Sequence, residues 1–385
     1  MITGIKSSRM ITPSGITAGY VYFDQQQILK VCKEELPCDQ FYDAGDNYVS
    51  PGFIDMHVHG GSGFDFCKAD ARGVAVAADF HLRHGTTTIL PTVTSVTFDA
   101  MCKSLNNIRQ CVSNGYQQAN IAGVHLEGPY FSPKQCGAQN PDSITAPVAE
   151  EYNALLEQFG DLIKRWSYAP EEDKDQSFVQ ALADHNVIPS MGHTDAIYDD
   201  CMKAFDKGCK LVTHLYSCTS TITRVGGYRR LGVLETAYLL DDMDVEIIAD
   251  GKHLPPELIR LICKLKTYDR VSLVTDAMQL AGTNDTISEI GGVPCMVEDG
   301  VAKLLDRTAF AGSIATTDRL LRVCIKDVGI AVTDAVKMIT ENPARILGIN
   351  AGKLEAGARP DVVVFDEDVN IQSVFVNGKV VTTEA

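Results

Sequence analysis

The chain has 385 residues, of which 45% are hydrophobic and 22% charged, as in an ordinary globular protein. This length allows one large domain and a smaller one. No apolar run reaches the 18 or so residues of a membrane span, and the net charge of -16 argues against nucleic acid and anionic membranes as partners. The 12 cysteines form no Cys-x-x-Cys pair, and the first residues lack the apolar centre of a signal peptide. We therefore expect a protein of the reducing cytoplasm.

Both ends of the chain have the pattern of short strands broken by turns. The β-rich runs lie at 19–23, 28–32 and 40–42 near the start, and at 361–365, 372–376 and 379–382 near the end. Asn377-Gly378 is a strong hairpin signal between the last two runs. Neither end could bury a core alone, so we predict that residues 1–47 and 350–385 pair into one small β-sandwich domain.

Between them, in residues 48–349, β-rich runs alternate with amphipathic segments of helical length, which is typical of a parallel sheet. The expected strands are 52–57, 86–91, 121–127, 163–168, 187–192, 210–214, 245–250 and 271–276. The clearest helices are 71–84, 98–114, 150–159, 178–185, 201–207, 231–240 and 256–265. Eight strand–helix units predict an α/β fold, a (β/α)8 barrel of the TIM type. Its chemistry should lie at the carboxyl ends of the strands.

Residues able to bind a metal gather at those predicted strand ends. The first strand ends in His57-Val-His59, and side chains two residues apart on a strand project from the same face. The later strand ends add Glu127, His193, His214, His253 and Asp276. A single histidine at a strand end is more often a hydrogen-bonded structural residue. Repetition at five strands favours a metal centre instead.

Imidazole and carboxylate ligands without thiolates suit Zn²⁺, Fe²⁺, Mn²⁺ or Co²⁺, and the ligand types do not choose among them. Such an ion lowers the pKa of bound water from 15.7 to about 7. Asp276 is placed to take a proton from this water and return it to a leaving group, although a purely structural or ligating role is the alternative. His253 could polarise a scissile carbonyl or bind an anion, unless it is a surface-loop residue. His125 shares a strand face with Glu127 and either supports that ligand or packs in the core.

The His-x-His pair, the single histidines at strands five and six and Asp276 at strand eight resemble the amidohydrolase superfamily. Three further stretches, His125-Leu-Glu-Gly-Pro129, Gly137-Ala-Gln139 and Ala249-Asp-Gly-Lys-His253, resemble its N-acetylglucosamine-6-phosphate deacetylase family. The resemblance implies hydrolysis of the acetamide of N-acetyl-D-glucosamine 6-phosphate to D-glucosamine 6-phosphate and acetate, in amino-sugar catabolism.

By position, the resemblance implies that Glu127, His193 and His214 hold one ion. It implies that His57 and His59 hold a second, with Glu127 between the two. The expected cofactor is therefore one or two divalent ions per chain, Zn²⁺ or Fe²⁺ first among them. The resemblance also implies that Gln139 contacts the sugar.

The loop after strand six departs from the family. There the family usually has Asn-Ala and then an arginine that meets the substrate phosphate, often across a dimer interface. This chain has Ser217-Cys218 in that place, followed by Arg224, Arg229 and Arg230. Arginine binds two phosphate oxygens at once. We therefore expect a homodimer in which this loop binds the substrate, with Arg229 and Arg230 favoured for the phosphate.

Three alternatives stay open. The arginines could be a solvated surface cluster. The protein could be another amide hydrolase, acting on N-acyl amino acids, cyclic amides or other N-acetylated sugars, in which the altered loop binds a substrate carboxylate. The barrel could also be a non-catalytic scaffold, although the complete ligand set with Asp276 argues against that.

Overall fold

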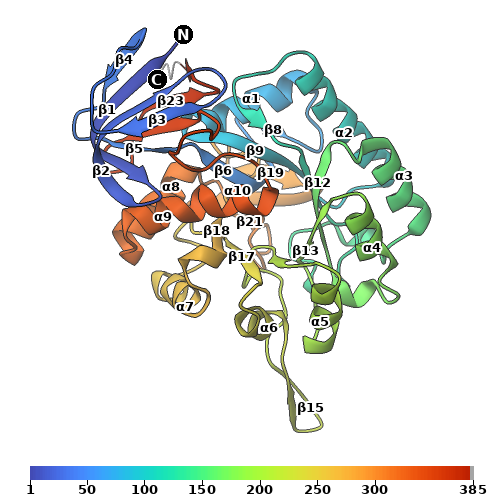
Figure 1. Cartoon of the computed structure of the whole chain (residues 1–385). Helices are drawn as coiled ribbons and strands as arrows, with labels where there is room; N and C mark the ends of the chain where they lie inside the picture. Colours follow the sequence, from blue (N-terminus) through green and yellow to red (C-terminus); the bar gives the residue numbers. More distant parts are fainter. Residues whose placement is uncertain (382–385) are drawn as a thin grey trace.

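The computed structural model describes residues 1–381 and shows two parts (Figure 1). A (β/α)8 barrel makes up most of the molecule, and a β domain built from both ends of the chain lies against one side of it. The expected fold class is thus confirmed. None of the helices in residues 1–381 has both the length and the apolar character needed to cross a membrane.

All eight expected barrel strands are present, and they pair in parallel. They are β6 (Phe53–Val58), β9 (Thr86–Val93), β11 (Val124–Glu127), β12 (Ile163–Tyr168), β13 (Ile188–Met191), β14 (Leu211–Val212), β17 (Asp244–Ile247) and β18 (Val271–Leu273). The two-residue strand β10 (Asn120–Ile121) pairs with β9 at the edge. Just beyond the ends of β18 and β6, the Asp276 N–H donates to the His57 carbonyl and the His59 N–H to the Ala277 carbonyl, each at 2.8 Å. The ring therefore closes at the level of the predicted ligands.

The helices surround the barrel (Figure 1). The seven expected ones are α1 (Ala71–Arg83), α2 (Phe98–Ser113), α3 (Ala149–Phe159), α4 (Ser177–Asp184), α5 (Tyr198–Asp206), α6 (Val233–Leu239) and α7 (Pro256–Lys266). The eighth, α8 (Thr317–Arg322), continues into a π-helical segment, and α9 (Val332–Ile339) and α10 (Glu341–Leu347) follow. Helix α1 begins at Ala71, where it was expected, and the Asp70 side chain caps it by accepting a hydrogen bond from the Gly73 N–H at 2.8 Å.

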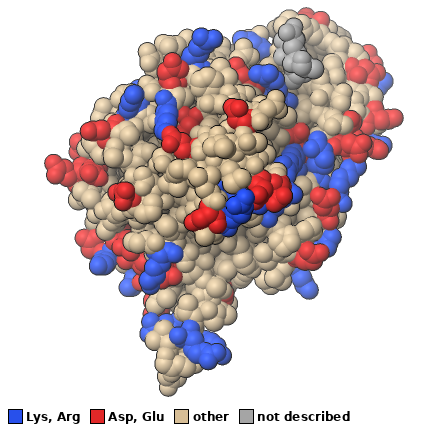
Figure 2. Space-filling view, turned by 180° about the vertical axis from the view of Figure 1, so that it is seen from behind, with Lys and Arg blue, Asp and Glu red and all other residues tan. Residues whose placement is uncertain are grey.

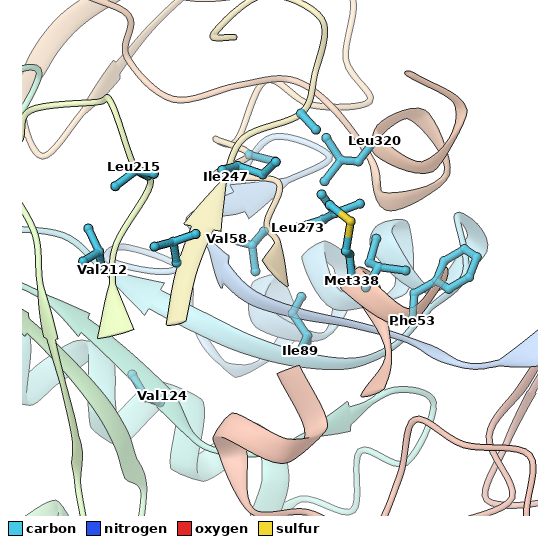
Figure 3. Close-up of a cluster of buried hydrophobic side chains, with 14 of the residues drawn as sticks. Phe53, Val58, Ile89, Val124, Val212, Leu215, Ile247, Leu273, Leu320 and Met338 are labelled. Atoms are coloured by element: carbon cyan, nitrogen blue, oxygen red, sulfur yellow. The ribbon is translucent and has the colours of Figure 1, made fainter. Parts of the chain in front are cut away.

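Both faces of the barrel strands bury side chains. Apolar side chains of the strands, among them Ile89 and Leu273, pack in one buried cluster with Leu320 and Met338 of the surrounding helices (Figure 3). A second apolar cluster includes Leu90, Ile248 and Val274 of the opposite strand faces. A polar network is also buried among the strands. It consists of Arg165, Ser167, Ser190, Thr213 and Glu246, all at 0% exposure.

An unpredicted three-stranded antiparallel sheet separates β18 from α8. Its strands are β19 (Ile287–Ile290), β20 (Val293–Glu298) and β21 (Val301–Leu304). Two small hairpins also occur, one of β7 (Gly60–Gly61) with β8 (Phe64–Asp65) and one of β15 (Thr223–Val225) with β16 (Tyr228–Arg230). The second hairpin projects from the barrel at the bottom of Figure 1.

The terminal domain is one hydrogen-bonded sheet in the order β24-β23-β22-β5-β1-β2-β3, with β4 also paired to β1. Its strands are β1 (Thr3–Thr12), β2 (Gly15–Phe23), β3 (Ile28–Cys32), β4 (Gln40–Asp43), β5 (Tyr48–Pro51), β22 (Val362–Phe365), β23 (Ile371–Val376) and β24 (Lys379–Val381). Thr382, the last residue of the expected strand 379–382, lies outside the described residues. A register shift between Ser7 and Met10 lets the first half of β1 pair with β4 and the second half with β5.

The buried core of this domain combines residues from both ends of the chain, among them Ile5, Val21, Val364 and Phe375. Strand β5 belongs to this sheet by its pairing with β1 and β22. We therefore propose that the domain boundary lies after Pro51 rather than after residue 47.

Candidate active site

The glutamate at the end of β11 stands at the centre of the predicted ligands. Glu127 Oε1 lies 2.9 Å from His214 Nε2 and 3.2 Å from His193 Nε2. Its other oxygen, Oε2, lies 3.3 Å from His59 Nε2. The carboxylate is only 2% exposed. Residues from four strand ends, up to 155 positions apart (59 to 214), thus meet at one carboxylate.

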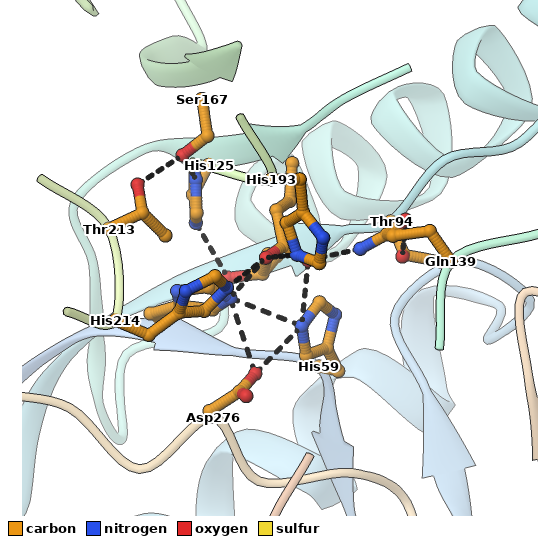
Figure 4. Close-up of polar contacts among 12 residues, drawn as sticks. His59, Thr94, His125, Gln139, Ser167, His193, Thr213, His214 and Asp276 are labelled. Carbon is orange, nitrogen blue, oxygen red and sulfur yellow. Dashed lines mark hydrogen bonds and ion pairs between the residues drawn. The ribbon is translucent and has the colours of Figure 1, made fainter. Parts of the chain in front are cut away.

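The two histidines of β6 face Asp276, which follows β18. The Nε2 atoms of His57 and His59 are 3.2 Å apart. Asp276 Oδ1 lies 3.3 Å from the first and 3.0 Å from the second. In Figure 4, His59, His193, His214 and Asp276 point toward one another.

Three of these residues have a backbone conformation that L-residues rarely adopt. The φ angles are 46° at His193, 29° at His214 and 48° at Asp276. A left-handed conformation costs roughly 1–2 kcal/mol at a non-glycine residue. Such residues cluster at functional sites, where the surrounding fold holds them in place. Here they turn the side chains inward immediately after the strands end.

The donor set fits one or two divalent ions. The ligand atoms of His57, Glu127 and His214 lie within 4.8 Å of one another, and so do those of His57, His59 and Asp276. Ligands about 2.05 Å from a tetrahedral ion are separated from each other by roughly 3.3 Å. The facing atoms described above are 2.9–3.4 Å apart. The spacing therefore matches what a shared cation requires.

One imidazole shows directly which nitrogen is free to bind an ion. His193 Nδ1 lies 2.9 Å from the Gln135 carbonyl oxygen, which can only accept. The proton of the neutral ring is therefore on Nδ1. Nε2, which faces Glu127, is the nitrogen that can bind an ion once an ion displaces its proton.

The charges at the site favour a cation. Burial opposes the charged form of His57 and His59. Glu127 and Asp276 outweigh that effect and raise the pKa to about 9 at His57 and about 10 at His59. Burial also opposes ionisation of Glu127, yet the positive charge of His57 and hydrogen bonds from the histidines lower its pKa well below the usual range. His57 and His59 thus carry protons at neutral pH unless a metal ion displaces them. At His193, too, burial is outweighed, and Cys218 and Glu127 raise the pKa well above its usual range.

A cavity of about 280 Å³ opens over these ligands. Nine of the predicted site residues line it: His59, Glu127, Gln139, His193, His214, Ser217, Cys218, His253 and Asp276. His57 lies fully buried beside His59 and Glu127. Arg224, Arg229 and Arg230 are exposed on the β15–β16 hairpin and do not line this cavity.

His253 is held by an acidic residue to which the sequence assigned no role. Its Nδ1 lies 2.9 Å from Asp250 Oδ2, while Asp250 Oδ1 accepts the backbone N–H of His253 at 2.8 Å. The ring also packs against Phe310 at 4.7 Å between centroids. The imidazole is therefore fixed at the edge of the cavity, only 4% exposed. The Ala249-Asp-Gly-Lys-His253 stretch could have indicated this contact, because an aspartate three residues before a histidine can close a turn.

His125 lies directly under the ligands. Its ring is 4.6 Å from that of His57, edge to face, and its Nε2 is 2.7 Å from Ser167 Oγ. Burial and the nearby Arg165 charge lower its pKa well below normal, so the ring is neutral. His125 is fully buried, as core packing requires, and its contact with the His57 ring is compatible with a supporting role toward that residue.

One wall of the cavity comes from the unpredicted insertion. Ile290 at the end of β19, together with Ala309 and Phe310 after β21, faces the cavity. No pattern in the sequence connects these residues to the site. Their position depends on how the insertion folds back over the mouth of the barrel.

Comparison with known proteins agrees with this geometry. The profile of the Amidohydrolase family matches residues 48–381. The N-acetylglucosamine-6-phosphate deacetylase of Bacillus subtilis (strain 168) is 31% identical over 98% of this chain and 96% of its own length. The N-acetylgalactosamine-6-phosphate deacetylase of Escherichia coli O157:H7 is 29% identical over 86% of this chain and 87% of its own.

Among solved structures, a mutant N-acetyl-D-glucosamine-6-phosphate deacetylase of Mycobacterium smegmatis, in complex with N-acetyl-D-glucosamine-6-phosphate, superposes with a TM-score of 0.92. It is 29% identical, and the match covers 99% of this chain and 100% of that one. The chain therefore belongs to the amidohydrolase family, in the branch of the N-acetylglucosamine-6-phosphate deacetylases.

Proposed function

We propose that this protein hydrolyses the acetamide of N-acetyl-D-glucosamine 6-phosphate, giving D-glucosamine 6-phosphate and acetate. The observation that carries the proposal is the convergence of four imidazoles and two carboxylates at the mouth of the barrel, beside a cavity of about 280 Å³. The relatives at similar length support the substrate class.

The ligands would be Glu127, His193 and His214 for one ion and His57 and His59 for a second, with Glu127 between them. A divalent ion held there supplies a Lewis acid that makes water nucleophilic at neutral pH. Zn²⁺ and Fe²⁺ suit this donor set best among the candidates.

The chain's own groups then handle the protons. Asp276 Oδ1 lies at the ligand cluster and faces the cavity, where it accepts a proton from the attacking water and passes it to the departing amine. His253, fixed through its Nδ1 by Asp250, presents its other nitrogen to the acetamide oxygen as that oxygen gains negative charge. Ser217, Cys218 and Gln139 line the space in which the sugar would lie.

The phosphate needs cations that this cavity lacks. Arg224, Arg229 and Arg230 are exposed on the projecting hairpin, and none of them forms an ion pair within residues 1–381. Arg224 lies directly opposite Arg229 in the pairing of the hairpin. Like charges placed opposite each other destabilise a hairpin unless an anion lies between them. Figure 2 shows basic side chains gathered at this tip.

We infer that the protein is a homodimer in which this hairpin reaches the cavity of the partner and binds the phosphate there. The exposed apolar side chains of the same hairpin, Val225 at 49% and Tyr228 at 81%, are suited to contact with a second subunit. The 12 cysteines are all free, which supports our proposal that the protein acts in the cytoplasm.

Acetate release tests the proposal. We expect turnover of N-acetylglucosamine 6-phosphate that stops when a chelator removes the metal and returns when Zn²⁺ or Fe²⁺ is added back. N-acetylgalactosamine 6-phosphate is the second candidate substrate, because a relative at 29% identity carries that name. Preference for an unphosphorylated sugar, or for an N-acyl amino acid, would exclude the phosphate assignment.

A further inference from the structure

A glutamine in the loop after β11 connects the end of β9 to the central carboxylate. Gln139 Oε1 accepts hydrogen bonds from Thr94 Oγ1 at 2.6 Å and from the Ser95 backbone N–H at 2.9 Å. Its Nε2 donates to Glu127 Oε2 at 2.7 Å. All four residues are nine-tenths or more buried, and Figure 4 shows Thr94 and Gln139 side by side at the edge of the site.

The orientation of this amide is determined by its neighbours. A backbone N–H can only donate, so the group facing Ser95 must be the amide oxygen. The NH₂ group then necessarily faces Glu127, whose Oε2 accepts its hydrogen bond. With the amide turned over, a donor would face a donor and an oxygen would face a carboxylate. Gln139 therefore has one stable orientation.

This bond holds the plane of the Glu127 carboxylate. With Oε2 held by Gln139, Oε1 points to His57, His193 and His214, and Oε2 also approaches His59. A carboxylate free to rotate could instead present both oxygens to a single ion. Each oxygen has two lone pairs, so Oε2 can accept the amide hydrogen and still bind an ion.

We propose that Gln139, supported by Thr94, is a positioning residue that fixes the orientation of the Glu127 carboxylate, with Oε1 toward three histidines and Oε2 toward His59, and so favours metal binding. This inference rests on the metal centre of the proposed function. It differs from a direct sugar contact, because both polar groups of the Gln139 amide are already engaged within the protein. Thr94 is the useful probe, since it is 2% exposed and does not line the cavity.

The experiment is a titration of the metal-free protein with Zn²⁺ against a chromophoric chelator, which needs no enzymatic activity. We expect Gln139→Met, which keeps the volume and removes the amide, to weaken Zn²⁺ binding about 10- to 100-fold. Thr94→Val should weaken it in the same direction by less, because the Ser95 N–H still holds the amide, and Thr94→Ser should restore it. Gln180→Met is the matched control, since the Gln180 amide also donates to a carboxylate, Asp184 at 2.9 Å, on the exposed face of α4.

The KM for the amino-sugar phosphate, measured with Zn²⁺ in excess, distinguishes positioning of Glu127 from direct contact with the sugar. A positioning role leaves KM near the wild-type value in Thr94→Val, whose side chain does not line the cavity. The proposal would be overturned if Gln139→Met raised KM without changing Zn²⁺ affinity while Thr94→Val changed neither quantity. Unchanged Zn²⁺ affinity in both Gln139→Met and Thr94→Val would also overturn it. If Gln139→Met does not fold, the comparison of Thr94→Val with Thr94→Ser decides alone. If the wild type fails to release acetate, the proposed function fails while the Zn²⁺ titration still tests this inference.

Discussion

Arginines occupy opposite environments in the barrel and in the β15–β16 hairpin. Arg165 is fully buried among the strands, where it forms a two-pronged ion pair with Glu246 and hydrogen bonds to Ser190 and Thr213. Arg229, on the hairpin, is exposed, and its one side-chain hydrogen bond within residues 1–381 goes to the Gly227 carbonyl. The first charge is compensated inside the chain, whereas the second is left available to an anion.

The difference shows which functions a single chain completes by itself. Parallel strands impose a fixed direction on each side chain, so residues distant in sequence reach one ion-sized space. A projecting hairpin does not direct its side chains toward a common point within the same chain. We therefore expect the interior to supply the chemistry and the hairpin to supply recognition once a second subunit is present. Each prediction below tests one side of this contrast.

The largest expected effect is on the proton-transfer group of the barrel. Asp276→Asn keeps the shape of the side chain and removes the base, so kcat for acetate release should fall about 10²- to 10⁴-fold. Zn²⁺ content and thermal stability, measured on the same sample, show whether the metal centre and the fold are intact. Undiminished turnover in this variant would mean that another group is the base.

The second effect is on stability, and it compares the two kinds of arginine directly. Arg165→Met leaves Glu246 charged and buried without its partner, so the free energy of unfolding should fall by about 3–5 kcal/mol. Arg229→Met, on the exposed hairpin, should change it by less than about 0.5 kcal/mol. Urea unfolding followed by circular dichroism measures both. Replacing the whole pair, Arg165→Met with Glu246→Leu, should recover much of the loss, because no uncompensated charge remains.

The parts that the sequence predicted share one physical basis. All eight barrel strands and seven helices followed from hydrophobic runs alternating with amphipathic segments. The ligand positions followed because side chains at strand ends converge whenever such a barrel closes. Convergence of the strand ends indicated a shared metal centre, and the family resemblance then grouped Glu127, His193 and His214 on one ion.

The parts that escaped prediction depend on tertiary packing. Strand β1 contains the polar run Lys6-Ser-Ser-Arg9, which hides its pairing with three other strands. The sheet β19–β21 and Phe310 reach the cavity only because the insertion folds over the barrel. Thr94 looks like any threonine at a strand end, and its contact with Gln139 joins residues 45 positions apart.

The third prediction concerns recognition by the hairpin. Replacing Arg229 and Arg230 together with alanine removes charge-assisted hydrogen bonds worth about 1.5–3 kcal/mol each. We expect kcat/KM for N-acetylglucosamine 6-phosphate to fall at least about 10-fold, while the value for unphosphorylated N-acetylglucosamine stays the same. Arg109→Ala is the matched control, because that arginine is paired with Asp161 on a distant surface. Equal losses for both sugars would show that the hairpin does not read the phosphate.

The smallest expected effect at neutral pH is on thermal stability. It concerns the histidines of β6 and again distinguishes the barrel from the hairpin. In the unfolded chain an imidazole has a pKa near 6.5, whereas the folded metal-free protein raises the pKa to about 9 at His57 and about 10 at His59. The stability that these protons contribute is complete below about pH 6.5 and is lost as the pH rises through the two folded values.

The Tm of the metal-free protein should therefore decline from pH 7 to about 8.5, before most thiols ionise. With excess Zn²⁺ the decline should disappear, because the ion replaces the protons. The His57→Asn, His59→Asn double variant should make the metal-free profile less steep, because His193 alone keeps a raised pKa, whereas alanine at Arg229 and Arg230 should leave its slope unchanged. A metal-free Tm that rises over this range would contradict the assignment of raised pKa values to the pair.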